Sequence, residues 1–308
     1  MIKSLIVTNH VGESIVLELR SPEKSGFLIQ SITGLGPVKG SVKFTDNASG
    51  DGGLFNSARI GTRNIVLNVL LLEKPTIEAT RLLSYKFFPV KKPINIVIET
   101  DERLVSIDGY VETNEPNIFS KNESASISII CGDPYFRSLE EQSTLFSGIS
   151  PSFEFPFDNN DLHEPLIEFG NIKKENTRNI IYYGESEPGL VIEIKMFSKV
   201  SSISIYNTGT REQMIISSAN LKNILSDDSE SEECFFENKD LITINTYSND
   251  KAITLLRNGV TYNIINTLDR KSSWFKLSRG NNIFGYTVPE GIDAVNFKIR
   301  NKVLYEGI

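Results

Sequence analysis

The sequence TRNIVLNVLLLEKPTIEATRLLSYKFFP, at positions 62–89, contains the clearest structural signals in the chain. Its first part, NIVLNVLLL (64–72), is an apolar stretch of strand length, rich in residues that favour sheets. Thr76 is a suitable helix N-cap, and apolar residues then recur at helical spacing until Pro89. A helix this short is stable only when it packs on a sheet. The segment therefore predicts a strand followed by a helix, 77–88, that covers a sheet.

Short strands separated by turn residues fill the rest of the first 136 residues. Several of them alternate apolar and polar residues, which is typical of strands with one buried and one solvated face. These stretches are LIVT (5–8), SIVLELR (14–20), FLIQSITGL (27–35), SVKFT (41–45), INIVIET (94–100) and ASISIIC (125–131). They predict an N-terminal β-domain with one helix over residues 1–136.

The pattern pauses after Phe136, where the polar, aperiodic stretch 137–152 is expected to be a linker. Strands then resume over residues 153–308, without helices between them, which favours a β-sandwich or jelly roll over a doubly wound α/β sheet. The predicted strands are NIIYYG (179–184), LVIEIKMF (190–197), SSISIYN (201–207), QMIISS (213–218), LITINTY (241–247), AITLLR (252–257), VTYNII (260–265), WFKL (274–277), NIFGYTV (282–288) and AVNFKIR (294–300).

The stretch DNASGDGGLFNSARIGTR (46–63) has four glycines and little periodicity. Long loops inside a compact domain are usually functional or disordered, so this one is either a loose hairpin tip or an arm that reaches a neighbouring subunit. It carries the apolar residues Leu54, Phe55 and Ile60 near Arg59 and Arg63. A loose tip has little use for three apolar side chains, so we favour the arm.

Composition excludes several classes of protein. The 308 residues include 32 basic and 39 acidic residues, a net charge of −7, which disfavours a protein that coats nucleic acid. No apolar stretch approaches the roughly 20 residues of a membrane-spanning helix. The start of the chain does not resemble a signal peptide, so we expect synthesis in the cytoplasm without membrane insertion.

The sequence contains no recognisable catalytic or metal-binding motif. Cys131 and Cys234 lie in different halves of the chain and are expected to be separate thiols rather than a disulfide. The only histidines, His10 and His163, are expected to be exposed polar residues. The glycine-rich stretch at 46–53 fails as a calcium loop because two ligand positions hold unsuitable residues. We therefore predict that the protein is not an enzyme and needs no metal or cofactor.

Two segments, 62–89 and EPNIFSKNESASISIICGDPYF (115–136), resemble the N-terminal domain of phage distal tail proteins, the Dit family. SITGLGPVKGSV (31–42) resembles the turn before that family's extended arm, and the stretch 240–288 and the ending LYEGI resemble its C-terminal sandwich. The resemblance implies a mainly β fold: an N-terminal β-domain with one helix and a belt-like arm, then a galectin-like sandwich.

The resemblance also implies a function in assembly. Family members form a ring, a hexamer, that joins the tail tube to tail-associated and receptor-binding proteins of the virion tail, or of a prophage-derived tail-like particle. The expected partners are therefore further copies of the chain, the major tail tube protein, a tail-associated protein and a receptor-binding protein. The subunit interface is expected to involve Leu54, Phe55, Arg59, Ile60, Arg63, Tyr85 and Phe88.

A second hypothesis is a monomeric β-sandwich that acts as a carbohydrate-binding module or adhesin. The single tryptophan, Trp274, fits sugar stacking, although a lone tryptophan in an alternating strand is more often a core residue. The mass in solution separates the two hypotheses, because a ring contains several subunits whereas the alternative is a monomer of 34.5 kDa.

Overall fold

The computed structural model describes residues 1–47, 49–120, 122–151, 170–225 and 234–308. The chain divides into two compact units. The first comprises Met1–Glu140 together with Leu304–Ile308, and the second comprises Glu141–Val303.

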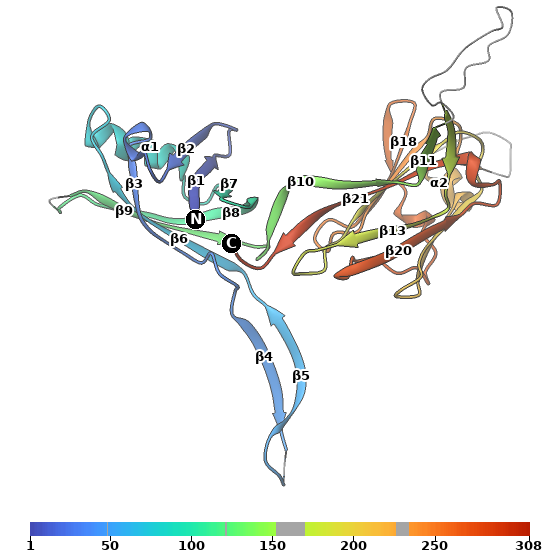
Figure 1. Ribbon diagram of the computed structural model, residues 1–308, viewed down its shortest axis with the longest axis horizontal. Helices are drawn as coiled ribbons and strands as arrows, with labels where there is room; N and C mark the ends of the chain where they lie inside the picture. Colours follow the sequence, from blue (N-terminus) through green and yellow to red (C-terminus); the bar gives the residue numbers. More distant parts are fainter. Residues whose placement is uncertain (48, 121, 152–169, 226–233) are drawn as a thin grey trace, which may run out of the picture. The chain divides into compact units, whose positions relative to one another are not determined.

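The first unit is a curved antiparallel sheet with one α-helix on it (Figure 1). The strands pair in the order β2-β1-β7-β8-β9-β6-β3. Their bounds are β1 Ile2–Thr8, β2 Ser14–Glu18, β3 Phe27–Thr33, β6 Arg63–Leu71, β7 Pro93–Thr100, β8 Leu104–Asn117 and β9 Ser124–Cys131, with a single turn of 3₁₀ helix, η1, at Pro22–Lys24.

Alternation along the strands places the core of this unit on one face of the sheet. On β6, Ile65, Leu67, Val69 and Leu71 are buried while the residues between them are more exposed. Helix α1 (Ile77–Phe87) covers this side of the unit, with Phe87 buried. Thr76 caps the helix, because its side chain accepts a hydrogen bond of 3.1 Å from the backbone N–H of Ala79. The predicted helix and its N-cap are confirmed.

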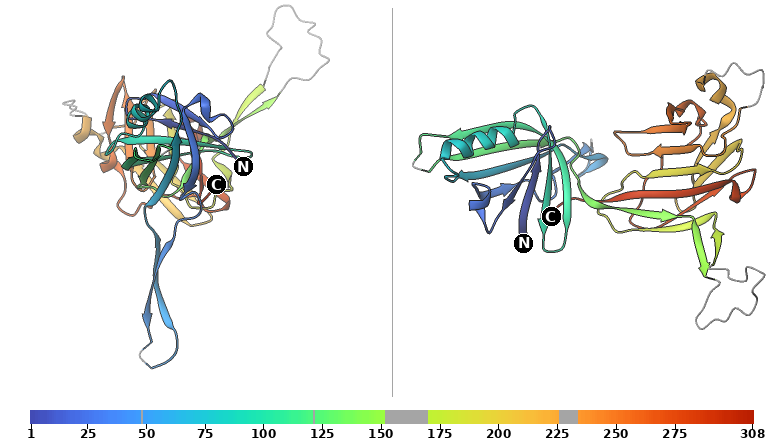
Figure 2. Two further views of the ribbon diagram at one scale, coloured as in Figure 1. Left: turned by 90° about the vertical axis from the view of Figure 1, so that its left-hand side faces the viewer. Right: turned by 90° about the horizontal axis from the view of Figure 1, so that it is seen from above.

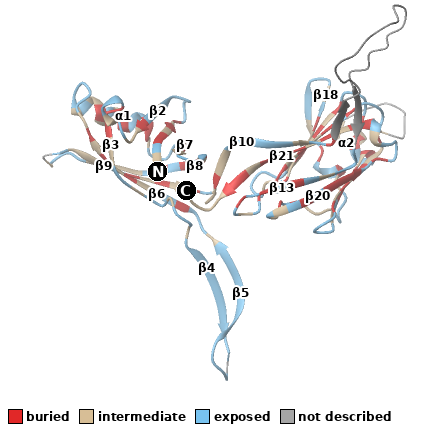
Figure 3. Ribbon diagram, in the orientation of Figure 1, coloured by how far each residue is buried: buried red, intermediate tan, exposed pale blue. Residues whose placement is uncertain are grey.

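Strands β4 (Gly40–Asp46) and β5 (Gly53–Ile60) form a two-stranded sheet of their own, which we call the arm. It projects from the first unit, and nearly all of its residues are exposed (Figures 1 and 3). The predicted aperiodic loop at 46–63 is therefore wrong in detail. The second half of that stretch is a strand that pairs with the predicted strand 41–45.

The second unit is a sandwich of two antiparallel sheets, drawn from a further direction in Figure 2. One sheet has the order β19-β18-β17-β14-β21 and the other the order β13-β20-β15-β16. The bounds are β13 Thr177–Tyr182, β14 Val191–Met196, β15 Ser202–Asn207, β16 Glu212–Ser217, β17 Leu241–Asn245, β18 Ala252–Arg257, β19 Val260–Asn263, β20 Gly280–Thr287 and β21 Val295–Tyr305. Short helical turns connect them: η2 Ser218–Asn220, α2 Leu221–Leu225, η3 Ile265–Thr267 and η4 Ile292–Ala294.

Aromatic side chains fill the space between these two sheets. The rings of Tyr286 and Phe297 stack with centroids 4.7 Å apart, and Phe146 packs edge-on against Phe297 at 4.8 Å. Trp274 is only half-buried, and the Lys251 ammonium lies 5.3 Å from its ring, so the core aromatic of the stretch 274–277 is Phe275. That stretch forms no strand, contrary to the sequence prediction.

The boundary between the two units, after Glu140, falls within the predicted linker 137–152. The described residues of that stretch are not aperiodic, because they form β10 (Phe136–Leu145) and β11 (Ser147–Pro151), and β11 pairs with β12 (Gly170–Lys174). The strand escaped prediction because β10 is polar and much of it is exposed. Leu304–Ile308 also belongs to the first unit rather than the second. Whether the two units fold independently stays a prediction.

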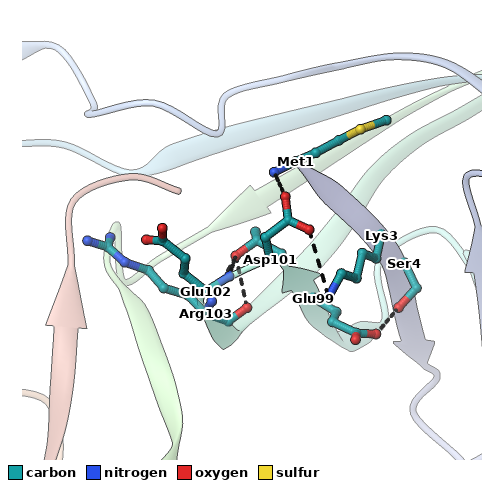
Figure 4. Close-up of polar contacts among 8 residues, drawn as sticks. Met1, Lys3, Ser4, Glu99, Asp101, Glu102 and Arg103 are labelled. Carbon is teal, nitrogen blue, oxygen red and sulfur yellow. Dashed lines mark hydrogen bonds and ion pairs between the residues drawn. The ribbon is translucent and has the colours of Figure 1, made fainter.

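Polar contacts hold the start of β1 near the turn between β7 and β8 (Figure 4). The Met1 ammonium donates a hydrogen bond to Asp101 Oδ2 at 2.5 Å, and the Lys3 ammonium lies 3.8 Å from Oδ1. The first of these contacts holds the pKa of the Asp101 carboxyl below its ordinary value. From the same turn, the Arg103 guanidinium stacks on the Tyr305 ring at 4.5 Å. Leu304–Ile308 is therefore anchored within the first unit.

Candidate assembly interface

The arm exposes four large apolar side chains. Val42 and Phe44 on β4, and Leu54 and Phe55 on β5, are 52%, 59%, 69% and 56% exposed. Phe44 and Phe55 are cross-strand partners whose rings contact edge-on with centroids 5.8 Å apart. An isolated two-stranded hairpin is marginally stable in water, and the arm buries no core of its own. Exposed apolar side chains gathered on a projecting element typically mark a surface that binds a partner.

Of the residues predicted for the interface, Leu54, Phe55, Arg59 and Ile60 all lie on the arm. Leu54 and Phe55 lie near the tip, whereas Arg59 and Ile60 lie at its base, opposite Ser41 and Gly40. Arg59 is exposed and Ile60 is half-buried. Sequence reasoning missed Val42 and Phe44 as interface candidates, because it read SVKFT (41–45) only as one of the strands of the N-terminal β-domain. Their alternation in SVKFT predicted the strand correctly but could not show that neither face is covered.

Arg63 is not an interface residue, and that prediction is wrong. The side chain begins β6 and is 1% exposed. Its guanidinium donates to four backbone carbonyl oxygens: Pro134 at 2.6 Å, Gly34 at 2.5 Å, Gly36 at 2.7 Å and Glu306 at 2.6 Å. Burial lowers the pKa of the Arg63 guanidinium, which nevertheless remains charged because an arginine does not lose its proton in a protein.

The four carbonyl groups show what Arg63 does for the arm. Gly34 and Gly36 belong to the segment that leads into β4, and Arg63 itself follows the end of β5, so one side chain ties both roots of the arm together. A side chain at Gly34 is impossible, because φ is +82° and a Cβ atom would lie 1.9 Å from the Asn64 carbonyl oxygen. The Ile308 N–H donates to the Leu35 carbonyl at 3.2 Å. Arg63, Gly34 and these carbonyl groups form what we call the arm clamp.

Two interface residues, Tyr85 and Phe88, were predicted at helix α1, and only Tyr85 is accessible. Phe88, the C-cap residue, is buried in the core, and its prediction as an interface residue is therefore wrong. Asn114 fixes this helix end, since its side-chain amide donates to the carbonyl oxygens of Ser84 and Phe88 at 3.2 Å each. Tyr85 is exposed beside Leu82 on the outer side of the helix, so it stays a candidate.

The groups considered for chemistry are scattered. Cys131 and Cys234 are separate free thiols, and burial raises the pKa of Cys131 to about 11. His10 is exposed, whereas His163 lies outside the described residues. Among the described residues no group of three or more His, Cys, Asp or Glu side chains could hold a metal ion. No helix in this part of the chain is long and apolar enough to cross a membrane.

This fold, a helix-covered β-domain with a projecting hairpin followed by a β-sandwich, has a counterpart among solved structures. The structure is similar to that of the SPP1 Dit protein, gp 19.1, with a TM-score of 0.65 and 12% sequence identity over 98% of this chain and 99% of that one. That protein is described as a paradigm of the hub adsorption apparatus in phages that infect Gram-positive bacteria. The mainly β fold predicted from the sequence, and its resemblance to this family, are confirmed at the level of the fold.

Two other solved structures give weaker likenesses, and these carry no further argument. Both are chains of the phage P2 baseplate in its activated conformation. The one with Ca has a TM-score of 0.48 at 11% identity, over 98% of this chain and 99% of that one. The one with Sr has a TM-score of 0.45 at 11% identity, over 97% and 98%. No protein-family model matches the chain, and no curated protein matches it.

Proposed function

We propose that the protein is a structural hub of a phage tail tip, a non-enzymatic component that assembles with copies of itself into a closed ring, most simply a hexamer. The observation that carries the proposal is the arm: an ordered hairpin with four exposed apolar side chains and no core of its own. The fold shared with SPP1 Dit supports a hub over an isolated binding module, because that protein belongs to an adsorption apparatus.

A ring requires a heterologous contact, in which one patch of each subunit meets a different patch of the next. The arm suits this geometry because it extends beyond the unit that bears it while the arm clamp holds both its roots. Burying each large apolar side chain contributes roughly 1.5–3 kcal/mol. The same contact recurs at every interface, so a modest gain per arm is sufficient to stabilise a closed ring.

In this role the protein resides in the virion tail, or in a prophage-derived tail-like particle, after assembly in the bacterial cytoplasm. The ring joins the major tail tube protein on one side to a tail-associated protein and a receptor-binding protein on the other. These partners and the hexameric state follow from the family resemblance.

The double variant Leu54→Ser, Phe55→Ser tests the arm contact. We expect it to lose assembly while each monomer unfolds at the same temperature as the unmodified protein, because neither side chain is part of a core. Analytical ultracentrifugation over a range of concentrations gives the assembly state, and thermal unfolding gives the stability.

A matched control carries the same kind of change on a different exposed hairpin. Leu256→Ser, Val260→Ser alters two exposed apolar residues of β18 and β19 in the second unit and should leave assembly intact. If the arm variant still forms full rings at low concentration, the arm is not the contact. If the unmodified protein is a monomer at every concentration, the hub proposal itself fails.

A further inference from the structure

One outer face of the second unit has an unusual composition. At the outward-facing positions of β13, β20, β15 and β16, all within the described part of the chain, there is no charged side chain. The outward positions include the hydroxyl, amide and aromatic residues Ser204, Tyr206, Gln213 and Thr287, and also the isoleucines Ile181, Ile215 and Ile283. Since 23% of the whole chain is charged, a solvent-exposed sheet face would be expected to carry several charges.

The opposite sheet of the same sandwich provides an internal comparison. On β14 and β21 the outward positions include Glu193, Lys195, Lys298 and Arg300. These form ion pairs, with the Arg300 guanidinium 2.5 Å from Glu193 and the Lys298 ammonium 3.5 Å from the same carboxylate. One face of the sandwich therefore has the usual charged surface, while the face of the four-stranded sheet, which we call the uncharged face, does not.

A tyrosine ring lies flat at the centre of the uncharged face. Tyr206 is opposite Gly285 in the sheet, and a Cβ atom at Gly285 would lie 2.4 Å from the Tyr206 ring. The ring therefore rests on the glycine backbone, and its other side is accessible because Tyr206 is only half-buried. Covering a glycine in this way stabilises a sheet, which explains the ring's position but not the absence of charge around it.

The groups around the ring can all donate and accept hydrogen bonds. Gln213 is the cross-strand partner of Tyr206, and Thr287 is the partner of Ser204, the next outward residue on β15. Two hollows open beside them, of about 780 and 420 Å³, and both include Ser217 in their lining. The wall of the larger hollow has Asn220 and Asn266, and also the charged residues Asp269, Arg270 and Lys271. Hydroxyl and amide groups thus continue from the face into the hollow, where charged groups join them.

We propose that the uncharged face binds a neutral glycan, with a pyranose ring stacked on Tyr206, its hydroxyl groups bonded to Ser204, Gln213 and Thr287, and the sugar chain continuing into the hollow at Ser217. A flat aromatic ring matches the apolar C–H face of a pyranose, and neutral donors and acceptors match its hydroxyl groups. This activity goes beyond the hub function and does not depend on it.

The test is an NMR titration of the full chain with two neutral oligosaccharides, maltoheptaose and chitotetraose. At least one should bind in the millimolar range and shift amide signals of residues 204, 206, 213 and 287. Tyr206→Ala and Gln213→Ala should each weaken binding by about tenfold or more. Tyr206→Phe keeps the ring and should bind within about threefold of the unmodified protein, which shows that any loss in Tyr206→Ala comes from stacking.

Lys298→Ala, on the charged face of the same sandwich, is the control and should bind normally. Thermal unfolding of every variant identifies any that fail to fold, and Gln213→Ala decides the result if Tyr206→Ala is one of them. The proposal is overturned if neither oligosaccharide binds, or if the shifts and the losses fall on the charged face. Ring formation, measured on the same samples, judges the hub function separately.

Discussion

The arm and the β18–β19 hairpin are built from similar two-stranded elements but differ in what supports them. On β18, Ile253 and Leu255 are fully buried in the sandwich, and β17 pairs with the strand along its other edge. The arm has neither a third strand nor a buried residue. One hairpin is thus stabilised by the core of its own chain, whereas the other is held at its roots and presents its side chains outward. Of the two hairpins, the arm is therefore the one whose exposed side chains are available for contact with another molecule.

The largest expected effect is at the arm clamp. Arg63→Ala removes a buried cation and leaves four backbone carbonyl groups without their donor, so the first unit should lose about 3–5 kcal/mol of unfolding free energy. Arg63→Lys keeps the charge but supplies fewer donors in a different geometry, and should recover only part of the loss. Denaturant unfolding measures both. Equal stability of the alanine variant and the unmodified protein would show that the arm is not held at its roots.

The comparison between the two hairpins is tested directly by a pair of truncations. Leu255→Ala creates a cavity in the sandwich and should cost about 2–5 kcal/mol of unfolding free energy without affecting assembly. Phe44→Ala on the arm should leave the unfolding free energy nearly unchanged and weaken assembly. Denaturant unfolding gives the unfolding free energy of each variant, and sedimentation gives its assembly state. If Phe44→Ala destabilises the monomer as much as Leu255→Ala does, the arm side chains are part of a core and the proposed difference between the two hairpins is wrong.

A change in helix α1 separates the stability of the first unit from assembly. Thr76→Ala removes the side-chain oxygen that accepts the Ala79 N–H and should cost about 1 kcal/mol. Because the helix cap does not contact the arm, rings should still form at concentrations where the monomer is folded. Thermal unfolding and sedimentation check this, with Thr76→Ser as the variant that keeps the cap.

The smallest effect concerns Asp101. Its pKa is lowered in the folded protein, chiefly by the hydrogen bond from the Met1 ammonium, so its contribution is present above its ordinary pKa of 3.8 and is lost as the pH falls through the lower folded value. Asp101→Asn should therefore lower stability slightly near neutrality, and the loss should diminish below about pH 4, where the carboxyl of the unmodified protein takes up its proton. Unfolding at a series of pH values measures the slope. A loss of stability at pH 3 larger than that at pH 7 would contradict this sign.

Sequence reasoning succeeded where the signal was local. The spacing of apolar residues after Thr76 predicted helix α1, and alternation predicted most strands of both units. It failed where the decisive partners are distant in the sequence. Arg63 is close in sequence to exposed residues, but its hydrogen-bond acceptors lie at positions 34, 36, 134 and 306. Every residue has a backbone carbonyl group, so the sequence does not show which of them accept from Arg63.

The prediction that residues 137–152 are aperiodic was wrong for a related reason. The residues of β10 are polar because much of the strand is exposed, and its partners are supplied by other strands of the sheet. Ion pairs such as the 2.6 Å contact between Arg300 and Glu141 hold it there. The uncharged face could not be predicted from the sequence either. Its residues come from four strands, and they form one surface only because strand pairing places them side by side.

The return of Leu304–Ile308 to the first unit has a consequence for biosynthesis. The Glu306 carbonyl is one of the four that Arg63 binds, yet this residue leaves the ribosome after the whole of the second unit. The arm clamp therefore cannot be completed while translation of residues 141–303 is in progress. On a nascent chain Arg63 already has the Gly34, Gly36 and Pro134 carbonyl groups within its reach, and only translation through Glu306 supplies the fourth acceptor that completes the clamp.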